Sequence, residues 1–240
     1  MAELKGKVAI VTGATRGIGR AIADAFADAG IQVAITSRNQ KDCEEAAAAI
    51  MKRTGTRALG VACDVRDAAS CAQLVERTAS EFGRLDILIN NAGIGAFRPV
   101  ADMDVATWDA VIGTNLNSLF YCTHPALPHL RRSGEAWVIS IGSLAGKNAF
   151  PNGAAYNASK FGLIGFSEAL MQEVRYDGIR VSYIMPGSVA TEFSHPSGST
   201  DGDWRVQAED IAQIVMDLLA TPARTLPSRV EVRPSQPPRK

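Results

Sequence analysis

The chain has 240 residues, 46% of them hydrophobic and 6% aromatic, and its 25 basic side chains balance its 25 acidic ones. This length and apolar content suffice for one α/β domain with a buried core and argue against a disordered chain. Because the formal net charge is zero, the chain offers no broad basic field, and we expect no nucleic-acid partner.

The start of the chain and its longest apolar runs bear on its location. The charged residues Glu3, Lys5 and Lys7 leave no room for the apolar core of a secretory signal. No later stretch approaches the roughly 20 apolar residues that cross a bilayer. We therefore expect a cytoplasmic protein without a membrane partner.

Short β-branched runs alternate along the chain with longer amphipathic stretches, a pattern typical of parallel βαβ units. The expected strands are 8–12, 32–37, 58–62, 87–90, 137–141, 180–185 and 230–233. The expected helices are 17–29, 40–53, 68–82, 105–130, 154–176 and 208–220. Glycines stand where four helices would end, as left-handed caps require, at Gly30, Gly55, Gly83 and Gly178.

The strands are apolar along their whole length, which suits a sheet covered on both sides. The predicted fold class is therefore α/β: a single-domain, doubly wound parallel sheet of about seven strands with helices on both faces. No change of composition divides the chain, so we expect one domain over residues 1–233. The Pro-rich residues 234–240 are predicted to form a mobile C-terminal tail.

Cysteine and histidine are scattered rather than grouped. The four cysteines form no C-x-x-C pair, and the histidines form no H-E-x-x-H motif. We expect no metal site and free, buried thiols. The residues concerned are Cys43, Cys63, Cys71, Cys122, His124, His129 and His195.

The strongest local signal is TGATRGIG, which starts at Thr12, directly after an expected strand and directly before an expected helix. Glycines let a backbone approach a pyrophosphate closely, and the start of a helix favours its negative charge. Taken alone, the motif is balanced by a second interpretation, a glycine turn that only connects strand to helix. The residues predicted to border the phosphates are Gly13, Thr15, Arg16, Gly17, Ile18 and Gly19.

The end of the second strand indicates which dinucleotide would bind. A free ribose 2′-hydroxyl is usually held by Asp or Glu at this corner, but here Ser37 is followed by Arg38. A guanidinium can bind a 2′-phosphate through paired N–H donors, and Arg16 can approach it from the other side. The predicted cofactor is NADP(H) rather than NAD(H). The alternative is that both arginines are merely solvated.

A second constellation lies downstream of the fifth expected strand. Tyr156 and Lys160 are four residues apart on a helix and share one face, while Ser143 follows the strand. A tyrosine has a pKa near 10, and a neighbouring cation lowers it. Tyr156 would then exchange a proton with an alcohol or carbonyl oxygen that Ser143 holds. Y-x-x-x-K alone is weak, because such pairs are common on ordinary helices.

Motifs along nearly the whole chain together resemble those of the short-chain dehydrogenase/reductases, in their compact one-domain branch with a Rossmann-type fold. Within that family the chain resembles 3-oxoacyl-carrier-protein reductases and carbonyl reductases. The motifs are TGATRGIG, Asp64 with Val65, NNAG at 90–93, Asn115, Ser143, YNASK at 156–160, and Pro186 with Gly187 followed by Thr191.

The resemblance implies roles for these residues. Ser143, Tyr156 and Lys160 would be the catalytic three, and Asn115 would hold a water of the proton relay. Asp64 and Val65 would contact adenine, Lys160 the nicotinamide ribose, and Val189 and Thr191 the carboxamide. Beyond the glycine turn, the implied cofactor contacts are Ser37, Arg38, Asp64, Val65, Asn91, Gly93, Tyr156, Lys160, Pro186, Gly187, Val189 and Thr191.

The function that these residues predict is an NADPH-dependent oxidoreductase acting on a small-molecule carbonyl or secondary alcohol, with Tyr156 as general acid/base. One alternative is a 3-oxoacyl-carrier-protein reductase, although the ending LPSRVEVRPSQPPRK from Leu226 departs from that group's glycine-rich last strand. Another is a catalytically silent NADP-sensing protein. The presence of all three catalytic residue types argues against the silent protein.

The segment 188–206 should set substrate choice, because ligands of such sheets bind beyond the carboxyl ends of the strands. It is either a lid or an idle surface loop. An apolar pocket is expected from Phe97, Leu144, Phe150, Phe193 and Trp204.

We also expect a homodimer or homotetramer. The helices 105–130 and 154–176 carry apolar residues on more than one face, and members of the family commonly pair these helices. Burial against the chain's own sheet is the alternative. The residues that suggest assembly are Leu163, Phe166, Leu170 and Met171.

Overall fold

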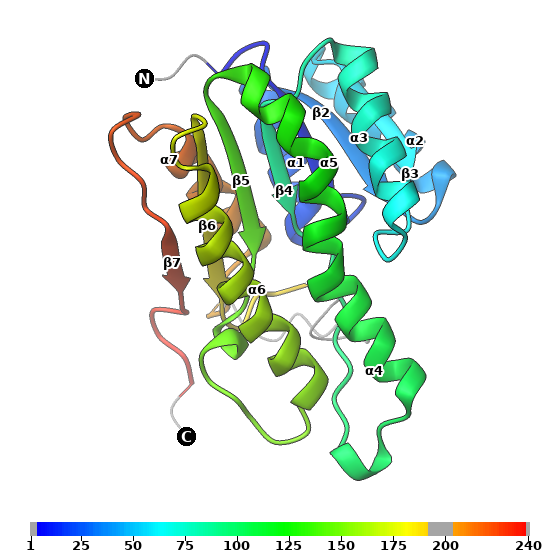
Figure 1. Ribbon diagram of the computed structural model, residues 1–240, viewed down its shortest axis with the longest axis vertical. Helices are drawn as coiled ribbons and strands as arrows, with labels where there is room; N and C mark the ends of the chain where they lie inside the picture. The colour runs from blue at the N-terminus through cyan, green and yellow to red at the C-terminus, as the bar shows by residue number, and fades with distance from the viewer. Residues whose placement is uncertain (1–3, 192–203, 239–240) are drawn as a thin grey trace.

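The computed structural model describes residues 4–191 and 204–238. Neighbouring strands pair in parallel in one seven-stranded sheet, in the order β3-β2-β1-β4-β5-β6-β7 (Figure 1). This confirms the predicted fold class, and each strand lies within one residue of its predicted bounds. The strands are β1 (Val8–Thr12), β2 (Gln32–Ser37), β3 (Ala58–Ala62), β4 (Ile87–Asn90), β5 (Ala136–Ile141), β6 (Ile179–Pro186) and β7 (Arg229–Val232).

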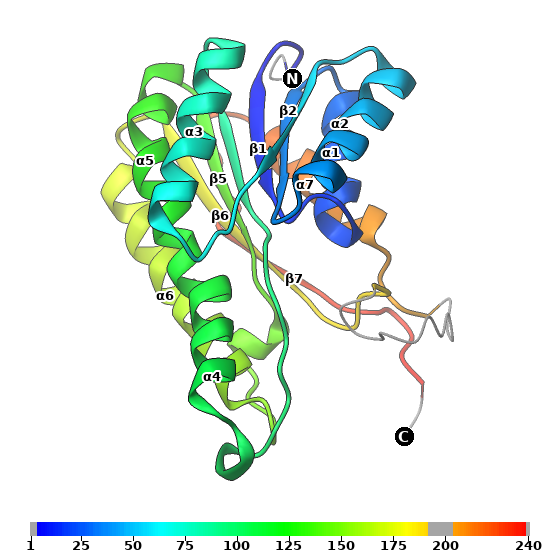
Figure 2. The ribbon, with the colours of Figure 1, turned by 90° about the vertical axis from the view of Figure 1, so that its right-hand side faces the viewer.

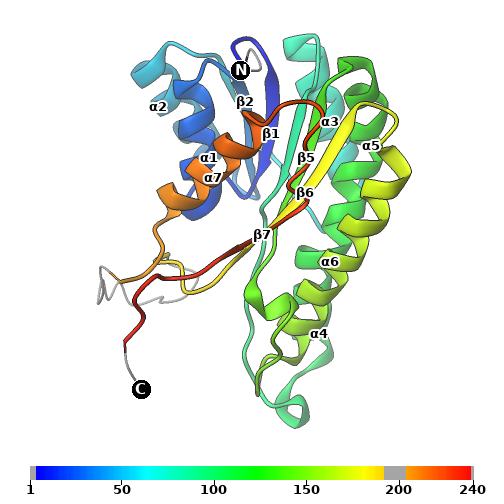
Figure 3. The same ribbon diagram turned by 90° about the vertical axis from the view of Figure 1, so that its left-hand side faces the viewer.

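Helices cover both faces of the sheet, as Figures 2 and 3 show from opposite sides. One face carries α1 (Gly17–Asp28), α2 (Gln40–Thr54) and α7 (Ala208–Leu219). The other carries α3 (Ala68–Phe82), α5 (Ser118–Ser133) and α6 (Ala154–Val174). The short α4 (Val105–Ile112) extends past the carboxyl ends of the strands. All four glycines predicted to end helices have positive φ, between 71° and 79°.

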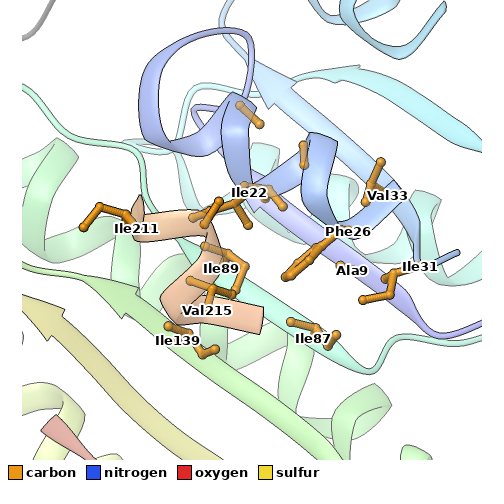
Figure 4. Packing of buried hydrophobic residues seen from close by; sticks show 14 of the residues in the cluster. Ala9, Ile22, Phe26, Ile31, Val33, Ile87, Ile89, Ile139, Ile211 and Val215 are labelled. Carbon is orange, nitrogen blue, oxygen red and sulfur yellow. The ribbon is translucent and has the colours of Figure 1, made fainter. Parts of the chain in front are cut away.

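Alternation along the strands explains the two-sided core. Successive side chains point to opposite faces, so Ile87 and Ile89 pack under α1 and α7, whereas Leu88 packs under α3 and α5. Figure 4 shows the first cluster, where Phe26 of α1 and Val215 of α7 meet over the sheet. Because both faces are apolar, the strands read as continuous hydrophobic runs in the sequence.

Residues 105–130 are helical throughout, as predicted, but they are not one regular α-helix. α4 continues through a π-helical turn (Gly113–Asn117) into α5, which ends at Ser133. A π turn accommodates an extra residue within a helix and often marks a functional position. Here it carries the buried Asn115, whose contacts are described below.

All four cysteines are free and buried, as predicted. Cys71 stands between two of the others, with its Sγ 4.0 Å from that of Cys63 and 3.5 Å from that of Cys122. The pKa of Cys63 is raised first by its hydrogen bond with Cys71, that of Cys71 first by its hydrogen bond with Cys122, and burial adds to both rises. These thiols are core residues.

Within the described parts of the chain, no helix is long and apolar enough to cross a membrane. Residues 234–238 of the predicted tail form no helix or strand, and 239–240 lie outside the described residues. The mobility of this tail stays a prediction.

Asp86 ties the amino ends of the strands together. Its fully buried carboxylate accepts hydrogen bonds from the backbone N–H of Val8 (2.8 Å), from Arg84 Nε (2.8 Å) and from Ser133 Oγ. Burial alone would raise its pKa, but these hydrogen bonds together hold the pKa of Asp86 below its ordinary value. Asp86 therefore joins β1, β4 and the end of α5 as a carboxylate.

Replacing Asp86 with Ala should lower the free energy of unfolding by about 2–3 kcal/mol near pH 7, since it leaves a buried N–H unpaired and breaks a charged hydrogen bond. A depressed carboxyl pKa stabilises the fold above the unfolded value of about 4, and this stabilisation is lost as the pH falls towards the folded pKa. Urea denaturation should thus show the gap between native protein and variant narrowing below about pH 4. Asp217→Ala, on the exposed side of α7, should shift stability by less than about 0.5 kcal/mol. A gap that widens on acidification would contradict this account.

Candidate active site

The predicted site residues lie at one edge of the sheet, where the carboxyl ends of β1 to β6 meet. Figure 1 shows this edge at the lower end of the sheet, next to α4 and the start of α6. Strand order reverses between β1 and β4, and ligands of doubly wound sheets bind at such a switch point. The topology therefore gathers residues that are up to 178 positions apart, from Gly13 to Thr191.

The glycine turn between β1 and α1 is tightly packed. A Cβ on Gly19 would lie 2.4 Å from Asn91 Nδ2 and 2.5 Å from the carbonyl oxygen of Gly13. Gly13 and Gly17 have φ of 65° and 56°, which favour glycine. Helix α1 starts at Gly17 with neither an acidic residue in its first turn nor a side-chain cap from Arg16. Its first N–H groups and its dipole thus suit a phosphate.

Thr15 and Arg16 line a cavity of about 460 Å³ between this turn and α2. Its other lining residues include Arg20, Asp42 and Glu45, which the sequence analysis did not single out. Arg16 is exposed at the mouth of the turn, and Ile18 is partly buried against the core. The motif therefore presents its backbone and one guanidinium outwards and keeps its apolar side chain inside.

The β2 corner is held by a thiol. Cys43 Sγ accepts the backbone N–H of Ser37 (3.1 Å) and lies 3.2 Å from Ser37 Oγ. Arg38 is exposed next to Ser37, and no hydrogen bond or ion pair occupies its guanidinium within the described residues. Asn39 caps α2 by accepting the N–H of Lys41 (2.9 Å). The corner thus presents one hydroxyl and one arginine above the carboxyl end of β2.

Asp64 and Val65 follow β3. The Asp64 carboxylate accepts two hydrogen bonds from Arg66 Nε, at 3.0 and 3.1 Å, and the hydrogen bonding from Arg66 holds the pKa of Asp64 below its usual range. Val65 packs into the core, and its carbonyl accepts a hydrogen bond from Cys71 Sγ (3.6 Å). The adenine contact expected of this pair stays a prediction, with the Val65 side chain largely withdrawn from the surface.

Asn91 ties β4 to the glycine turn. Its Nδ2 donates to the carbonyl oxygens of Thr12 (2.8 Å) and Gly13 (3.1 Å), and its backbone N–H donates to Thr12 Oγ1 (2.9 Å). Gly93 follows, and a Cβ there would lie 3.4 Å from Asn115 Oδ1 and 3.9 Å from Lys160 Nζ. Asn91 therefore fixes the turn, while Gly93 gives backbone space beside Lys160.

Ser143, Tyr156 and Lys160 converge as predicted. Ser143 begins a short 3₁₀ turn after β5, where its Oγ accepts the N–H of Ala145 (3.1 Å), and its side chain hydrogen-bonds to Tyr156. Tyr156 and Lys160 lie on α6 and are buried, with Lys160 Nζ 5.8 Å from the Tyr156 ring centroid. Lys160 Nζ donates to the carbonyl oxygen of Ile141 (2.9 Å). Strand β5 and helix α6 thus place all three groups together.

The expected electrostatics are corrected by the structure. Burial raises the pKa of Tyr156, and only the hydrogen bond with Ser143 opposes that rise. Lys160 does not lower it, because the ammonium points to the Ile141 carbonyl and is itself desolvated, which lowers the pKa of Lys160 to about 8. In this arrangement Tyr156 is a neutral phenol and Lys160 titrates close to neutral pH.

Asn115 lies within the π turn and reaches two other segments. Its Oδ1 accepts the N–H of Ile94 (2.8 Å), and its Nδ2 donates to the Ile94 carbonyl (2.9 Å) and to Ser159 Oγ (3.1 Å). Ser159 Oγ in turn donates to the carbonyl of Tyr156 (2.7 Å). The Asn115 side chain therefore braces the loop after β4 against α6, and the role in a water relay stays a prediction.

Two residues of the YNASK motif were given no role by the sequence analysis. Ser159 connects Asn115 to Tyr156, and Asn157 Nδ2 donates to the carbonyl of Ala145 (2.7 Å), next to Ser143. Both are buried polar residues. A polar side chain directly beside a catalytic motif, on the helix face that packs inwards, is the signal that would have found them.

The segment after β6 closes the site over α1. Gly187 N–H donates to the carbonyl of Val232 (2.9 Å), and a Cβ on Gly187 would lie 2.3 Å from Leu144. Val189 pairs with Val206, and a Cβ on Gly17 would lie 3.7 Å from Thr191 Cγ2. Pro186 ends β6. Pro186, Gly187, Val189 and Thr191 thus border the site, whereas 192–203, including Phe193 of the predicted lid, lies outside the described residues.

Of the residues expected to line an apolar pocket, Phe97 and Phe150 have ring contacts near Tyr156. The Phe97 ring lies 5.5 Å from the Tyr156 ring and 5.8 Å from the Phe150 ring, centroid to centroid. Leu144 packs on Gly187, and Trp204 stacks with Arg205 at 5.4 Å. Among the described residues, Phe97 thus packs against Tyr156, and Phe150 packs against Phe97. In the same part of the chain, no group of three or more Cys, His, Asp or Glu residues has the geometry of a metal site.

Lys160→Met should raise the free energy of unfolding by about 1–3 kcal/mol near pH 7, because it removes a desolvated cation from the interior. The native lysine loses its proton above about pH 8 and the unfolded one above about pH 10, so the variant's advantage should disappear between those values. Urea denaturation near pH 7 and pH 10 measures both effects, with the exposed Lys52→Met as control. A variant less stable than the native protein at pH 7 would show that the Ile141 hydrogen bond outweighs desolvation.

The strand order and the glycine turn between β1 and α1 define a doubly wound dinucleotide-binding domain. Residues 7–202 match the family described as short chain dehydrogenase. The protein belongs to the short-chain dehydrogenase/reductase family of oxidoreductases, whose members bind NAD(P)(H) and act on small molecules.

Three relatives illustrate the range of this similarity. D-threitol dehydrogenase of Mycolicibacterium smegmatis is 38% identical over 193 residues, which cover 80% of this chain and 74% of that protein. The 3-oxoacyl-acyl-carrier-protein reductase of Escherichia coli is 38% identical over 192 residues, 80% of this chain and 77% of that protein. A metagenomic short-chain oxidoreductase solved in complex with NADP is 34% identical with a TM-score of 0.86, covering 98% of this chain and 100% of that chain.

Proposed function

We propose that the protein is an NADPH-dependent carbonyl reductase. The observation that carries the proposal is the convergence of Ser143, Tyr156 and Lys160 at the carboxyl edge of the sheet, beside the glycine turn. When bound, a nicotinamide cofactor supplies the hydride, and the protein supplies position and a proton.

The residues around the turn fit a phosphorylated dinucleotide. Gly13 and Gly19 allow the turn to pack closely against Ala92 and Asn91, where a Cβ would collide, and the uncapped start of α1 suits the pyrophosphate. Arg38 and Arg16 are both exposed and could bind a 2′-phosphate, with Ser37 as a hydroxyl donor. The metagenomic relative that was solved with NADP supports this preference over NAD.

The remaining cofactor contacts are proposed in order from the adenine to the nicotinamide. Asp64 and Val65 would meet adenine, and Asn91 with Gly93 would form the wall that their packing on the turn suggests. Lys160 would bond the nicotinamide ribose. Pro186, Gly187, Val189 and Thr191 would flank the carboxamide end, because they follow β6 at the carboxyl edge of the sheet and Thr191 lies near Gly17.

Tyr156 acts as the general acid in this proposal. Its raised pKa keeps the phenol protonated near neutral pH, which suits donation to the oxygen of a carbonyl during reduction. Ser143 donates a second hydrogen bond to that oxygen and orients it. Lys160, with a pKa of about 8, exchanges protons at the same pH, and Asn115 keeps Tyr156 in place through Ser159. Alcohol oxidation uses the same groups in reverse.

A 3-oxoacyl-carrier-protein reductase is the second candidate, favoured by the 38% identity to the Escherichia coli enzyme. Following NADPH absorbance with ketones, aldehydes, quinones and a 3-oxoacyl thioester separates the two functions. A reductase of free carbonyl compounds consumes NADPH with the first three classes, whereas fast turnover of the thioester alone would favour the carrier-protein reductase. Absence of turnover with every class, together with tight NADPH binding, would favour the silent cofactor-sensing protein instead.

We also propose assembly into a homodimer or homotetramer. Leu163 and Leu170, which suggested assembly in the sequence, are buried within the protein's own core. The proposal is supported instead by Phe120 of α5 and Phe161 of α6, which are 54% and 47% exposed. Light scattering at micromolar concentration distinguishes a monomer from either assembly.

A further inference from the structure

The aromatic ring of Phe97 packs against Tyr156, and a second ring, Phe150 from a different loop, packs against Phe97. The Phe97 ring meets the Tyr156 ring at 71°, an edge-to-face arrangement, and is tilted by 46° to the Phe150 ring. Phe97 is 51% exposed and Phe150 is 42% exposed. We call these two residues the aromatic pair. Each keeps a large apolar surface in solvent, and Phe97 joins this surface to the Tyr156 ring that the proposed reaction uses.

The backbone holds the aromatic pair in place. Arg98 N–H donates to the carbonyl of Asn152 (2.8 Å) and so joins the loop of Phe97 to the loop of Phe150. A Cβ on Gly153 would lie 2.5 Å from the Phe150 ring, so this glycine lets the ring lie against the start of α6. These contacts make the pair part of the site's framework, which is the condition for recognising a substrate group.

The charges on these two loops are already paired. Residues 94–99 and 144–153 contain two charged side chains, Arg98 and Lys147. Arg98 lies 3.6 Å from the Asp104 carboxylate, and Lys147 lies 3.0 Å from that of Glu231. The loops therefore present apolar rings beside Tyr156 and offer no unpaired cation to a carboxylate, sulfonate or phosphate on the substrate.

We infer that the site takes carbonyl compounds in which an uncharged aromatic or bulky apolar group is attached directly to the carbonyl carbon. The inference rests on the proposed function: the carbonyl oxygen meets Tyr156 and Ser143, and the attached group lies on the aromatic pair. The carbonyl carbon gains a hydride from NADPH, which becomes NADP⁺, and the oxygen gains the Tyr156 proton, which solvent replaces. Ring contacts and apolar burial then separate such substrates from small or anionic ones.

Steady-state rates with acetophenone, acetone and pyruvate test the inference. The native protein should show kcat/KM for acetophenone at least about 30-fold above that for acetone, with pyruvate lowest. Phe97→Ala should reduce the acetophenone-to-acetone ratio about tenfold, and Phe97→Leu should reduce it less. The matched control Tyr176→Ala, which removes an aromatic ring that is 92% exposed, should leave the ratio unchanged.

A binding measurement separates this inference from the proposed function. In Tyr156→Phe protein with NADPH bound, acetophenone should bind in ligand-observed NMR, and adding Phe97→Ala should weaken that binding about tenfold. If acetophenone bound in a Phe97-dependent way but the native protein did not turn it over, the proposed reductase function would be refuted. The proposed recognition of an aromatic group would then still hold. Equal rates for acetophenone and acetone, or a ratio that Phe97→Ala does not change, would refute the recognition.

Discussion

Replacing Tyr156 with Phe should lower kcat for carbonyl reduction by about 10²–10⁴-fold, because the variant keeps the ring but loses the proton that the phenol donates. The ring remains packed on Phe97, and Lys160 remains bonded to Ile141, so neither the fold nor the cofactor surface should change. NADPH affinity, measured by fluorescence titration, should stay within about twofold of the native value. The loss should therefore appear in NADPH absorbance at saturating substrate.

A matched control is available just after the end of the helix that carries Tyr156. Tyr176 follows α6, is 92% exposed and stacks with Arg175 at 5.9 Å, so Tyr176→Phe should leave kcat unchanged. If Tyr156→Phe retained kcat within tenfold of the native protein, another group would have to supply the proton. If it lost NADPH binding as well, Tyr156 would be a binding residue rather than the acid.

Replacing Arg38 with Asp should reverse the choice of cofactor. A charged hydrogen bond to a 2′-phosphate contributes about 1.5–3 kcal/mol, and an aspartate would repel the phosphate as well. We expect the Kd for NADPH to weaken by about 100-fold. NADH should bind at least as tightly as before, since a carboxylate at this corner accepts a bond from a free 2′-hydroxyl.

Titrations with both cofactors at constant ionic strength measure this change. Arg224→Asp reverses the charge of another exposed arginine, in the loop before β7, and should affect NADPH and NADH equally. A native protein that binds NADH more tightly than NADPH would refute the assignment of Arg38. If the Kd for NADPH did not change in Arg38→Asp, we would assign the binding of the 2′-phosphate to Arg16 instead.

The fold could be predicted because its signals are local. Apolar runs of four to eight residues gave the strands. Glycines with positive φ follow the ends of α1, α2 and α3 as expected, whereas α6 ends at Val174, before Gly178. The π turn could not be predicted in this way, since periodicity compares neighbours within about two turns. Asn115 bonds Ile94, 21 residues away, and Ser159, 44 residues away. Only the assembled sheet edge brings these partners together.

In the site, too, local spacing could be predicted, whereas contacts between distant segments could not. The spacing of Tyr156 and Lys160 predicted that they share a helix face, which is correct. It also suggested that the cation lowers the tyrosine pKa, which is wrong, because burial and the Ile141 carbonyl act from outside the helix. Residue type placed Phe97 and Phe150 in an apolar pocket, but the ring contact of Phe97 with Tyr156 and the hydrogen bond that joins the two loops form only in the folded chain.

The row of sulfur atoms from the end of β3 across α3 to α5 offers a built-in reporter. Cys63, Cys71 and Cys122 are at most 3% exposed, and Cys43 is fully enclosed under β2. A thiol-specific dye therefore meets these side chains only in molecules that have opened, so the labelling rate follows the population of open forms. Mass spectrometry of the labelled peptides would then map which half of the sheet opens first, without any engineered probe.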